Sequence, residues 1–477
     1  MAHRPNFTIR WKNFRGFRDT GWIEIRPLTI LLGPNSSGKS SFVAPLLLMA
    51  QTLRSHDAET ALVTRGPLID AGRYSDLVYK HNANLNITFG LRFHVHDIKK
   101  RLKQIGEYPP GAIELIFDMP RVGTQSPRLK RFDLYDMYVR PFLRFSRRSE
   151  EKFQLSGPYA KGMTLPEIKA ISNARPVNFW FTPANILRSR MTVLRRGKPD
   201  IPRSLPKFSH KFAGLLSAIG YASSEINNFL SRLTYIGPLR ENPKRHYEAA
   251  GEEPGKVGPR GQYAPHLLRS KKNVRQAVNK WIRQFGLGIG FAVEEESRDI
   301  FSIVVKGTTP NVACNLADVG FGASQVFPLI VQAVASEQDG LTIAEQPEIH
   351  LNPRLQRVLA DLLVSMANGT QHVIVETHSE HIMVRLRRLI AQKKIEAKDV
   401  GIYFIEKANG ESIIRPIPVD SIGHIKEHDW PKEFFADALE ESLGLAEAQQ
   451  RSLRPQTHSI VRGRRDTTSR GSNKRSS

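Results

Sequence analysis

Apolar positions near the N-terminus predict a strand, a tight turn and a helix in close succession. Leu28–Leu32 is an almost continuous apolar run, and Gly33–Ser40 after it is rich in glycine and serine. Ser41–Leu53 then repeats large apolar residues at helical spacing. Before this segment, Phe7–Trp11 is a short strand candidate. After it, Leu85–Val95 alternates between apolar and polar residues, as a half-buried strand does.

The second half of the chain alternates short apolar runs with longer helical patterns. The expected strands are Leu341–Ala344, His372–Glu376 and Val400–Ile405, and the expected helices are Ala323–Ala335, Leu355–Ala367 and Ser379–Gln392. An amphipathic helix is also expected over Asn273–Phe285, with Gly286 ending it. Strands that alternate with helices predict a parallel sheet with crossover helices, and therefore an α/β fold.

Between these two parts, residues 97–230 are rich in Pro and Arg and show weak periodicity. Regular structure is expected to return only after Thr234. The tail beyond about residue 446 is rich in Arg, Ser, Thr, Gly and Gln, a composition typical of disorder.

The turn after the first apolar strand fits the phosphate-binding pattern G-x-x-x-x-G-K-[ST] at every fixed position. Backbone N–H groups of such a loop cradle phosphate oxygens at the positive end of the following helix. Lys39 is expected to reach the β- and γ-phosphates of ATP, and Ser40 to ligate Mg²⁺. The predicted nucleotide-binding residues are Gly33, Pro34, Asn35, Ser36, Ser37, Gly38, Lys39, Ser40 and Ser41.

A P-loop requires a second motif, an acidic residue at the end of a neighbouring strand that holds Mg²⁺. Glu345 ends the apolar run Leu341–Ala344 and is predicted to take this role, through a water molecule. About 300 residues separate Glu345 from Lys39, which is typical of heads that carry a long insertion between their two halves. Glu348 follows two residues after Gln346 and is a candidate general base.

Two further motifs continue the same order. His378 follows the strand His372–Glu376, at a position similar to that of a histidine in ABC- and SMC-type ATPases, and this resemblance implies a contact to the γ-phosphate. Gly322, Ser324 and Gln325 open a helix just before the strand that ends at Glu345. They resemble the signature motif of the same class, which implies a contact to the ATP bound by a second subunit.

Together these motifs resemble those of ABC-type ATPases in the RecF- and SMC-like superfamily. Within it, the run Glu345–Pro353 and the patch Trp430–Phe435 resemble small bacterial ATPases that include subunits of the Septu and retron antiphage systems. The resemblance covers about residues 1–95 and 230–445. It implies an ABC-type head: a P-loop parallel sheet with flanking helices and an antiparallel β part. The composition adds a basic inserted region to this head.

Motifs and composition together predict a domain plan of five segments. These are an N-terminal half of the head (1–96), a basic insert (97–232), a C-terminal half (233–398), a cap (399–446) and a basic tail (447–477). The resemblance implies a homodimer or higher oligomer with ATP between the heads, and an HNH-type nuclease subunit docked on the insert or near Trp430–Phe435. Gln346 stands where most ABC ATPases have the glutamate that activates water, so hydrolysis is expected to be slow.

The distribution of charge along the chain predicts a polyanionic partner. The formal net charge is +24. Residues 97–210 hold 23 Lys and Arg against 10 Asp and Glu, and residues 451–477 hold 8 against 1. We expect the insert and tail to bind nucleic acid with little sequence preference; an acidic protein partner or simple solubility is the alternative. The insert arginines expected to form this surface are Arg128, Arg131, Arg144, Arg147, Arg148, Arg195 and Arg196.

The remaining composition narrows the functional classes. Cys314 is the only cysteine, so neither an internal disulfide nor a cysteine zinc site is expected. No apolar run is long enough to span a bilayer, and a cytoplasmic location is predicted. The resemblance implies a defence ATPase that regulates a nuclease; the alternative is a RecF/SMC-like DNA-binding ATPase in DNA repair or chromosome maintenance. An autonomous nuclease of the OLD type and a transporter are disfavoured.

Overall fold

The computed structural model describes nine stretches of the chain, all within the compact unit Met1–Trp430. They are residues 7–93, 110–119, 126–149, 152–195, 209–249, 254–307, 312–336, 339–369 and 371–430. The predicted tail and most of the patch Trp430–Phe435 lie outside the described residues. No helix in the described stretches is long and apolar enough to cross a membrane.

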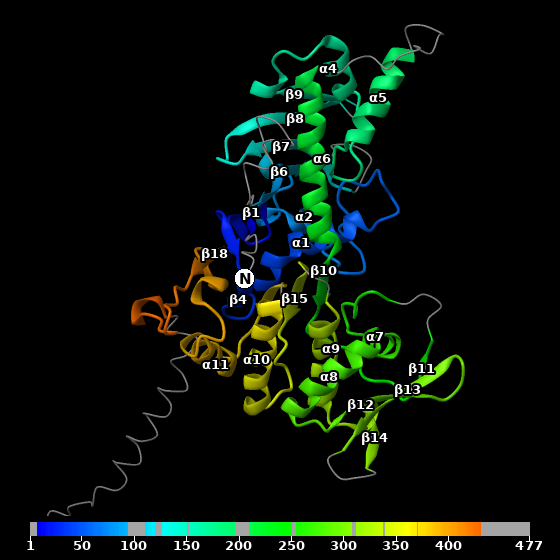
Figure 1. The fold of residues 1–477 in the computed structure, drawn as a ribbon. Helices are drawn as coiled ribbons and strands as arrows, with labels where there is room; N and C mark the ends of the chain where they lie inside the picture. Colours follow the sequence, from blue (N-terminus) through cyan, green and yellow to red (C-terminus); the bar gives the residue numbers. More distant parts are fainter. Residues whose placement is uncertain are drawn as a thin grey trace, which may run out of the picture. The chain divides into compact units, whose positions relative to one another are not determined.

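A six-stranded sheet carries the nucleotide motifs (Figure 1). Its order is β10 (Leu233–Ile236), β15 (Leu341–Glu345), β16 (His372–Glu376), β4 (Leu28–Leu32), β17 (Val400–Ala408) and β18 (Glu411–Pro416). The first five strands are parallel, and β18 pairs antiparallel with β17. The strands expected from the apolar runs are confirmed, and the strand before the P-loop lies in the middle of the sheet.

The helices predicted from apolar spacing are present beside these strands in the sequence. They are α1 (Lys39–Leu53), α9 (Phe321–Ala335), α10 (Pro353–Gly369) and α11 (Glu380–Ala391). Helix α1 is buried over most of its length, in keeping with its nearly continuous apolar sequence. One polar residue inside it, Gln51, has a structural role. Its side-chain amide donates to the Val63 and Ile69 carbonyls and accepts from the Leu68 N–H.

The weakly periodic region contains more regular structure than its sequence predicted. Strands β6 (Pro110–Asp118), β7 (Arg128–Asp136), β8 (Pro141–Ser149) and β9 (Lys152–Ser156) pair in succession, and β6 pairs with β5 (Ile87–Phe93). With β1 (Phe7–Phe14), β2 (Phe17–Asp19) and β3 (Ile23–Ile25) they form one eight-stranded sheet. Strands β6–β9, which lie within the expected insert 97–232, thus continue the sheet begun by the N-terminal half.

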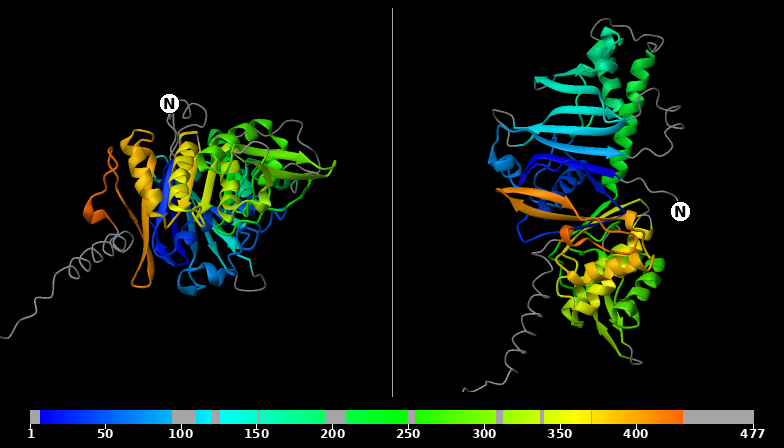
Figure 2. Two further views of the ribbon diagram at one scale, coloured as in Figure 1. Left: turned by 90° about the horizontal axis from the view of Figure 1, so that it is seen from below. Right: turned by 90° about the vertical axis from the view of Figure 1, so that its left-hand side faces the viewer.

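Helix α6 (His210–Ser231) lies along this sheet, as the right-hand view of Figure 2 shows. Helices α4 (Leu165–Ser172) and α5 (Pro183–Arg195) lie near β9, at the end of this sheet away from the P-loop strands. One hydrophobic cluster joins α6, the sheet, α1 and the inner strands of the P-loop sheet. This shared core fixes the P-loop helix between the two sheets.

A third group of elements lies beside α9. It contains α7 (Ala264–Ser270), α8 (Lys272–Phe285), β11 (Tyr247–Glu248), β12 (Gly290–Glu295), β13 (Ile300–Lys306) and β14 (Ala313–Asn315). The predicted amphipathic helix is confirmed as α8, which ends at Gly286 in the left-handed conformation. Cys314 is exposed on β14.

Candidate nucleotide site

The P-loop connects β4 to α1 at the carboxyl end of the parallel strands. Its tip, Pro34–Ser36, is exposed, whereas the Lys39 side chain is only 3% exposed. The Lys39 ammonium donates to the Gly33 and Pro34 carbonyls at 2.9 and 2.8 Å. Burial lowers the pKa of Lys39, and nearby carboxylates oppose that shift, Glu376 most strongly.

Close packing explains the two fixed glycines of the loop. Gly33 and Gly38 have φ of +146° and +115°, and a Cβ on Gly33 would lie 2.0 Å from the Ile405 carbonyl oxygen. From β18, the Ser412 hydroxyl donates to the Ser37 carbonyl at 2.7 Å. The Ser37 hydroxyl is buried without a partner among the described residues. The loop therefore presents the fixed backbone that a phosphate cradle requires, and Ser37 adds a hydroxyl that is available to a ligand.

Two carboxylates meet beside the P-loop. Glu345 ends β15, Glu376 ends β16, and the two residues are directly paired in the parallel register. The Ser40 hydroxyl donates to Glu376 Oε2 at 2.9 Å, and the Lys39 ammonium lies 3.9 Å from Glu376 Oε1. Both side chains are buried. Glu345, predicted from the sequence, thus has a second carboxylate next to it that the sequence analysis missed.

Burial shifts the pKa of both carboxyl groups upward. Burial, together with the Glu376 charge, raises the pKa of Glu345 to about 7. Burial also raises the pKa of Glu376. Two carboxylates in a poorly solvated position favour a bound cation, and Mg²⁺ prefers oxygen ligands of this kind. The residues present therefore fit the metal and the triphosphate that the motif implies.

Gln346 has an unusual backbone conformation at the position expected to activate water. Its φ is +43°, a region that residues other than glycine rarely occupy. Its N–H donates to the Glu376 carbonyl at 2.8 Å, and Arg240 Nη2 donates to the Glu345 and Gln346 carbonyls at 3.0 and 3.2 Å. Arg240 is 6% exposed, and burial lowers its pKa to about 10. Arg240 and β16 therefore hold this strained segment from two sides.

The predicted base and the predicted switch histidine lie together. The His378 backbone N–H donates to Glu348 Oε1 at 2.8 Å. Burial raises the pKa of Glu348, whereas burial and the Lys39 charge lower that of His378. A cavity of about 500 Å³ is lined by both residues and by Gln346. The structure thus brings Gln346, Glu348 and His378 to one opening, next to the P-loop carboxylates.

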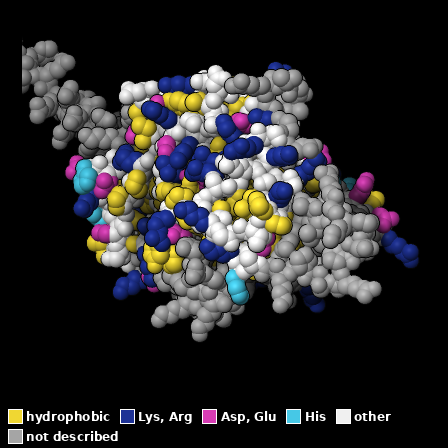
Figure 3. Space-filling model, turned by 90° about the horizontal axis from the view of Figure 1, so that it is seen from above, with side chains coloured by type: hydrophobic (Ala, Val, Ile, Leu, Met, Phe, Trp, Pro, Cys, Tyr) yellow, Lys and Arg dark blue, Asp and Glu magenta, His cyan; other side chains and the backbone are white. Residues whose placement is uncertain are grey.

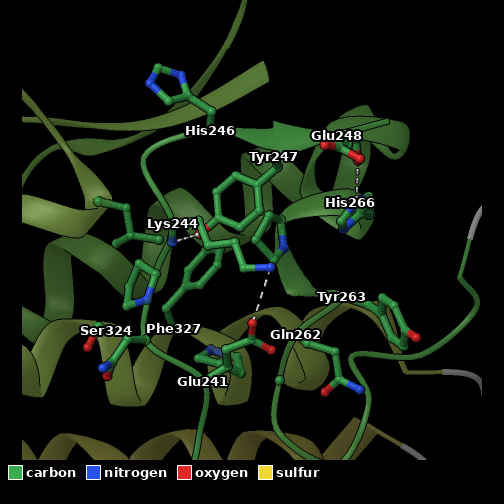
Figure 4. Close-up of a pocket in the computed structure, with 16 residues that line it drawn as sticks. Glu241, Lys244, His246, Tyr247, Glu248, Gln262, Tyr263, His266, Ser324 and Phe327 are labelled. Atoms are coloured by element: carbon green, nitrogen blue, oxygen red, sulfur yellow. Dashed lines mark hydrogen bonds and ion pairs between the residues drawn. The ribbon is translucent and has the colours of Figure 1, made fainter. Parts of the chain in front are cut away.

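The helix predicted to contact a second subunit's ATP presents a different surface from the one expected. Ser324 and Gln325, in the first turn of α9, are 3% and 2% exposed. Gly322 packs against the His350 carbonyl, which a Cβ would approach to 2.9 Å. Ser324 faces a separate cavity of about 380 Å³ whose labelled lining residues include Lys244, Tyr247 and His266 (Figure 4). The contact to a second ATP stays a prediction.

Most insert arginines that the structure describes hold the sheet together. Arg131 and Arg144 pair with the fully buried Asp133 at 3.1 Å each, and Arg128 pairs with Asp118 at 2.8 Å. Arg147 donates to the Leu129 carbonyl. Arg148 donates to Gln154, and the side chains of Arg195 and Arg196 lie outside the described residues. These arginines are therefore less available for phosphates than the sequence suggested.

Other cations are exposed at the end of the molecule that carries α4 and α5. Seen from above, this face shows Lys and Arg side chains spread between apolar and neutral ones (Figure 3). From residue 152 to 195 the only acidic residue is Glu167, which is buried. The exposed basic residues of this segment and of the start of α6 are Lys152, Lys161, Lys169, Arg175, Arg188 and Lys211.

Comparison with known families places an ATPase domain over part of the chain. Residues 251–383 match the family described as AAA ATPase domain, and residues 395–445 match DUF3696, a family of unknown function. The first match includes Glu345 and His378, and the P-loop precedes it. No curated protein matches the chain.

Solved structures similar to the chain include three SMC heads. The SMC head domain from Thermotoga maritima is 13% identical, with a TM-score of 0.37, covering 87% of this chain and 100% of that one. An SMC head bound to the C-terminal winged-helix domain of ScpA is 12% identical, with a TM-score of 0.39 and coverages of 86% and 97%. An SMC head with an extended coiled coil, bound to a ScpA domain derived from Pyrococcus furiosus, is 11% identical, with a TM-score of 0.38 and coverages of 94% and 100%.

Proposed function

We propose that this protein binds ATP and Mg²⁺ at the P-loop and hydrolyses ATP slowly, as a molecular switch. The observation that carries the proposal is the meeting of Lys39, Ser40 and Glu345 at one end of a parallel sheet, beside an opening lined by Gln346, Glu348 and His378. Bound Mg²⁺ would neutralise phosphate charge in the transition state.

We assign a separate role to each side chain of this site. Lys39 balances phosphate charge, Ser40 and Glu345 hold the metal, and His378 senses the γ-phosphate. Gln346 orients a water molecule but cannot take its proton, because an amide is not a base at neutral pH. Glu348 shares the cavity and is the available carboxylate. Loss of a general base typically slows a reaction about 10²–10⁴-fold, so turnover is expected to be slow.

A slow switch requires something to control. We propose that two heads associate with ATP between them, and that the assembly regulates an HNH-type nuclease subunit in antiphage defence. The motif resemblance supports this reading, and the exposed basic residues near α4 and α5 support contact with nucleic acid. The alternative is a RecF/SMC-like ATPase that binds DNA during repair or chromosome maintenance, which the same head and the same basic surface also support.

Nucleotide binding is the first test. Titration of the full chain with fluorescent ATP and Mg²⁺ should give saturable binding, and Lys39→Ala should abolish it. Lys398→Ala, which changes an exposed lysine paired with Glu396, is the matched control and should bind as the natural chain does. Equal affinity in the natural chain and Lys39→Ala would contradict the assignment of the P-loop.

Partner identity is a second test. The tagged chain should be co-expressed with the products of its neighbouring genes and purified with and without ATP. A co-purifying nuclease whose activity depends on intact Lys39 supports the regulatory role. Recovery of the chain with DNA alone, and normal phage resistance after loss of the P-loop lysine, would favour the DNA-repair alternative.

A further inference from the structure

We infer that Glu376 is a second carboxylate of the magnesium site, a role that neither its sequence position nor the P-loop pattern assigns to it. The inference rests on the proposed ATP and Mg²⁺ binding. Glu376 is the last residue of β16, the strand that lies between β15 and the P-loop strand β4. This position alone places its side chain at the carboxyl edge where the triphosphate would bind.

The distance between Glu376 and Ser40 matches a shared metal. Mg²⁺ binds oxygen at about 2.0–2.1 Å in octahedral geometry, which separates adjacent ligand oxygens by about 2.9–3.0 Å. Ser40 Oγ and Glu376 Oε2 are 2.9 Å apart. Ser40 is the P-loop residue that ligates Mg²⁺, so a carboxylate oxygen at this distance lies where a neighbouring ligand, or the acceptor of a metal-bound water, belongs.

Charge favours the same conclusion. Glu345 and Glu376 are 7% and 6% exposed and are directly paired on adjacent strands, so two acidic side chains lie in one poorly solvated position. The ammonium nearest Glu376, Lys39 at 3.9 Å, is engaged with two loop carbonyls. A divalent cation between the carboxylates and Ser40 would offset both negative charges. The described residues hold no cluster of three metal-ligating side chains, and Mg²⁺ commonly binds one or two carboxylates together with substrate phosphates.

A purely structural role for Glu376 predicts a different outcome from a role at the metal. If Glu376 only holds Ser40 in place, its loss weakens ATP binding with or without metal. If Glu376 serves the metal, its loss weakens metal binding but removes a negative charge near the phosphates, so ATP without metal binds as well as before or more tightly. The two effects on ATP affinity then have opposite signs.

The experiment uses the full chain and Glu376→Gln, with Mn²⁺ as a paramagnetic substitute for Mg²⁺. We expect Mn²⁺ affinity in the presence of ATP, measured by electron paramagnetic resonance, to fall about 10–100-fold, the range found when partners around a metal site are removed. ATP affinity in EDTA should be unchanged or higher. Glu376→Asp, which keeps the carboxylate, should recover part of the Mn²⁺ affinity. Glu406→Gln, which changes a partly exposed carboxylate on β17, should behave as the natural chain does.

Each result has one meaning. Unchanged Mn²⁺ affinity in Glu376→Gln overturns the inference while leaving ATP binding established. An equal loss of ATP affinity with Mn²⁺ and with EDTA also overturns it, in favour of a structural role. If the natural chain binds no ATP under any condition, the proposed function itself fails, and that result is distinct from both.

Discussion

The buried carboxyl group of Glu345 should make the stability of the metal-free protein fall as pH rises. Its pKa in the folded chain is about 7, against an ordinary value of 4.5. A carboxyl group with a raised pKa binds protons more tightly in the folded than in the unfolded chain. Its contribution to stability is therefore fully present below pH 4.5 and is lost as pH rises through 7.

The size of the effect follows from the same two values. One pKa unit corresponds to about 1.4 kcal/mol, so the step from 4.5 to about 7 corresponds to at most about 3.5 kcal/mol. Glu376 and Glu348, whose pKa values burial also raises, act in the same direction. His378 acts in the opposite direction. Burial lowers its pKa, so the unfolded chain binds this proton more tightly than the folded chain does, and the free energy of unfolding falls at acidic pH. Glu345→Gln should remove about 1–3 kcal/mol of pH dependence.

Urea unfolding in EDTA at several pH values between 5 and 8 measures this difference. The free energy of unfolding of the natural chain should fall more steeply than that of Glu345→Gln, and the variant should be the more stable protein at pH 8. Glu406→Gln should retain the natural slope. Parallel slopes for the natural chain and Glu345→Gln would refute the claim that burial beside Glu376 controls the ionisation of Glu345.

Three further predictions concern turnover, nucleic acid and cleavage. Gln346→Glu should raise the steady-state ATPase rate if Glu348 is not already the base, and Glu348→Gln should lower any measurable rate; rapid turnover by the natural chain would contradict the role given to Gln346. Replacing Lys161 and Lys211 with Glu should weaken binding to DNA or RNA and reduce its dependence on salt, measured by fluorescence anisotropy; unchanged binding would exclude this surface. The purified chain should not cut DNA or RNA with Mg²⁺ and ATP, and cleavage that survives Lys39→Ala would contradict the need for a partner nuclease.

Much of the nucleotide-binding sheet could be predicted because its information is local. Leu28–Leu32 and His372–Glu376 are fully buried strands, and buried parallel strands are short apolar runs in the sequence. The P-loop pattern was equally accessible, because each fixed residue has a local cause. Gly33, for example, lies so close to the Ile405 carbonyl that no side chain fits.

The eight-stranded sheet was missed for a physical reason. Strand β6 is buried on both faces, at Ile113, Leu115 and Phe117 and also at the alternate positions Ala112, Glu114 and Ile116. It therefore lacks the alternation of apolar and polar residues that marks a sheet with one solvent-exposed face. On β7 and β8, arginines face the buried Asp133 and hide the apolar pattern further. The same pairing explains why a count of arginines overstated the phosphate-binding surface of the insert.

The residues missed at the site depend on strand register, which a single sequence does not specify. Glu376 was taken as the end of an apolar run, and its place beside Glu345 follows only once β15 and β16 are known to be adjacent and parallel. Arg240 reaches Glu345 and Gln346 from more than 100 residues away, and Ser412 reaches the P-loop from β18. One rule would have found Glu376 in advance. Where an acidic residue ends one strand of a parallel P-loop sheet, a second acidic residue at the end of another predicted strand should be tested as its neighbour, because both lie at the edge where the metal binds.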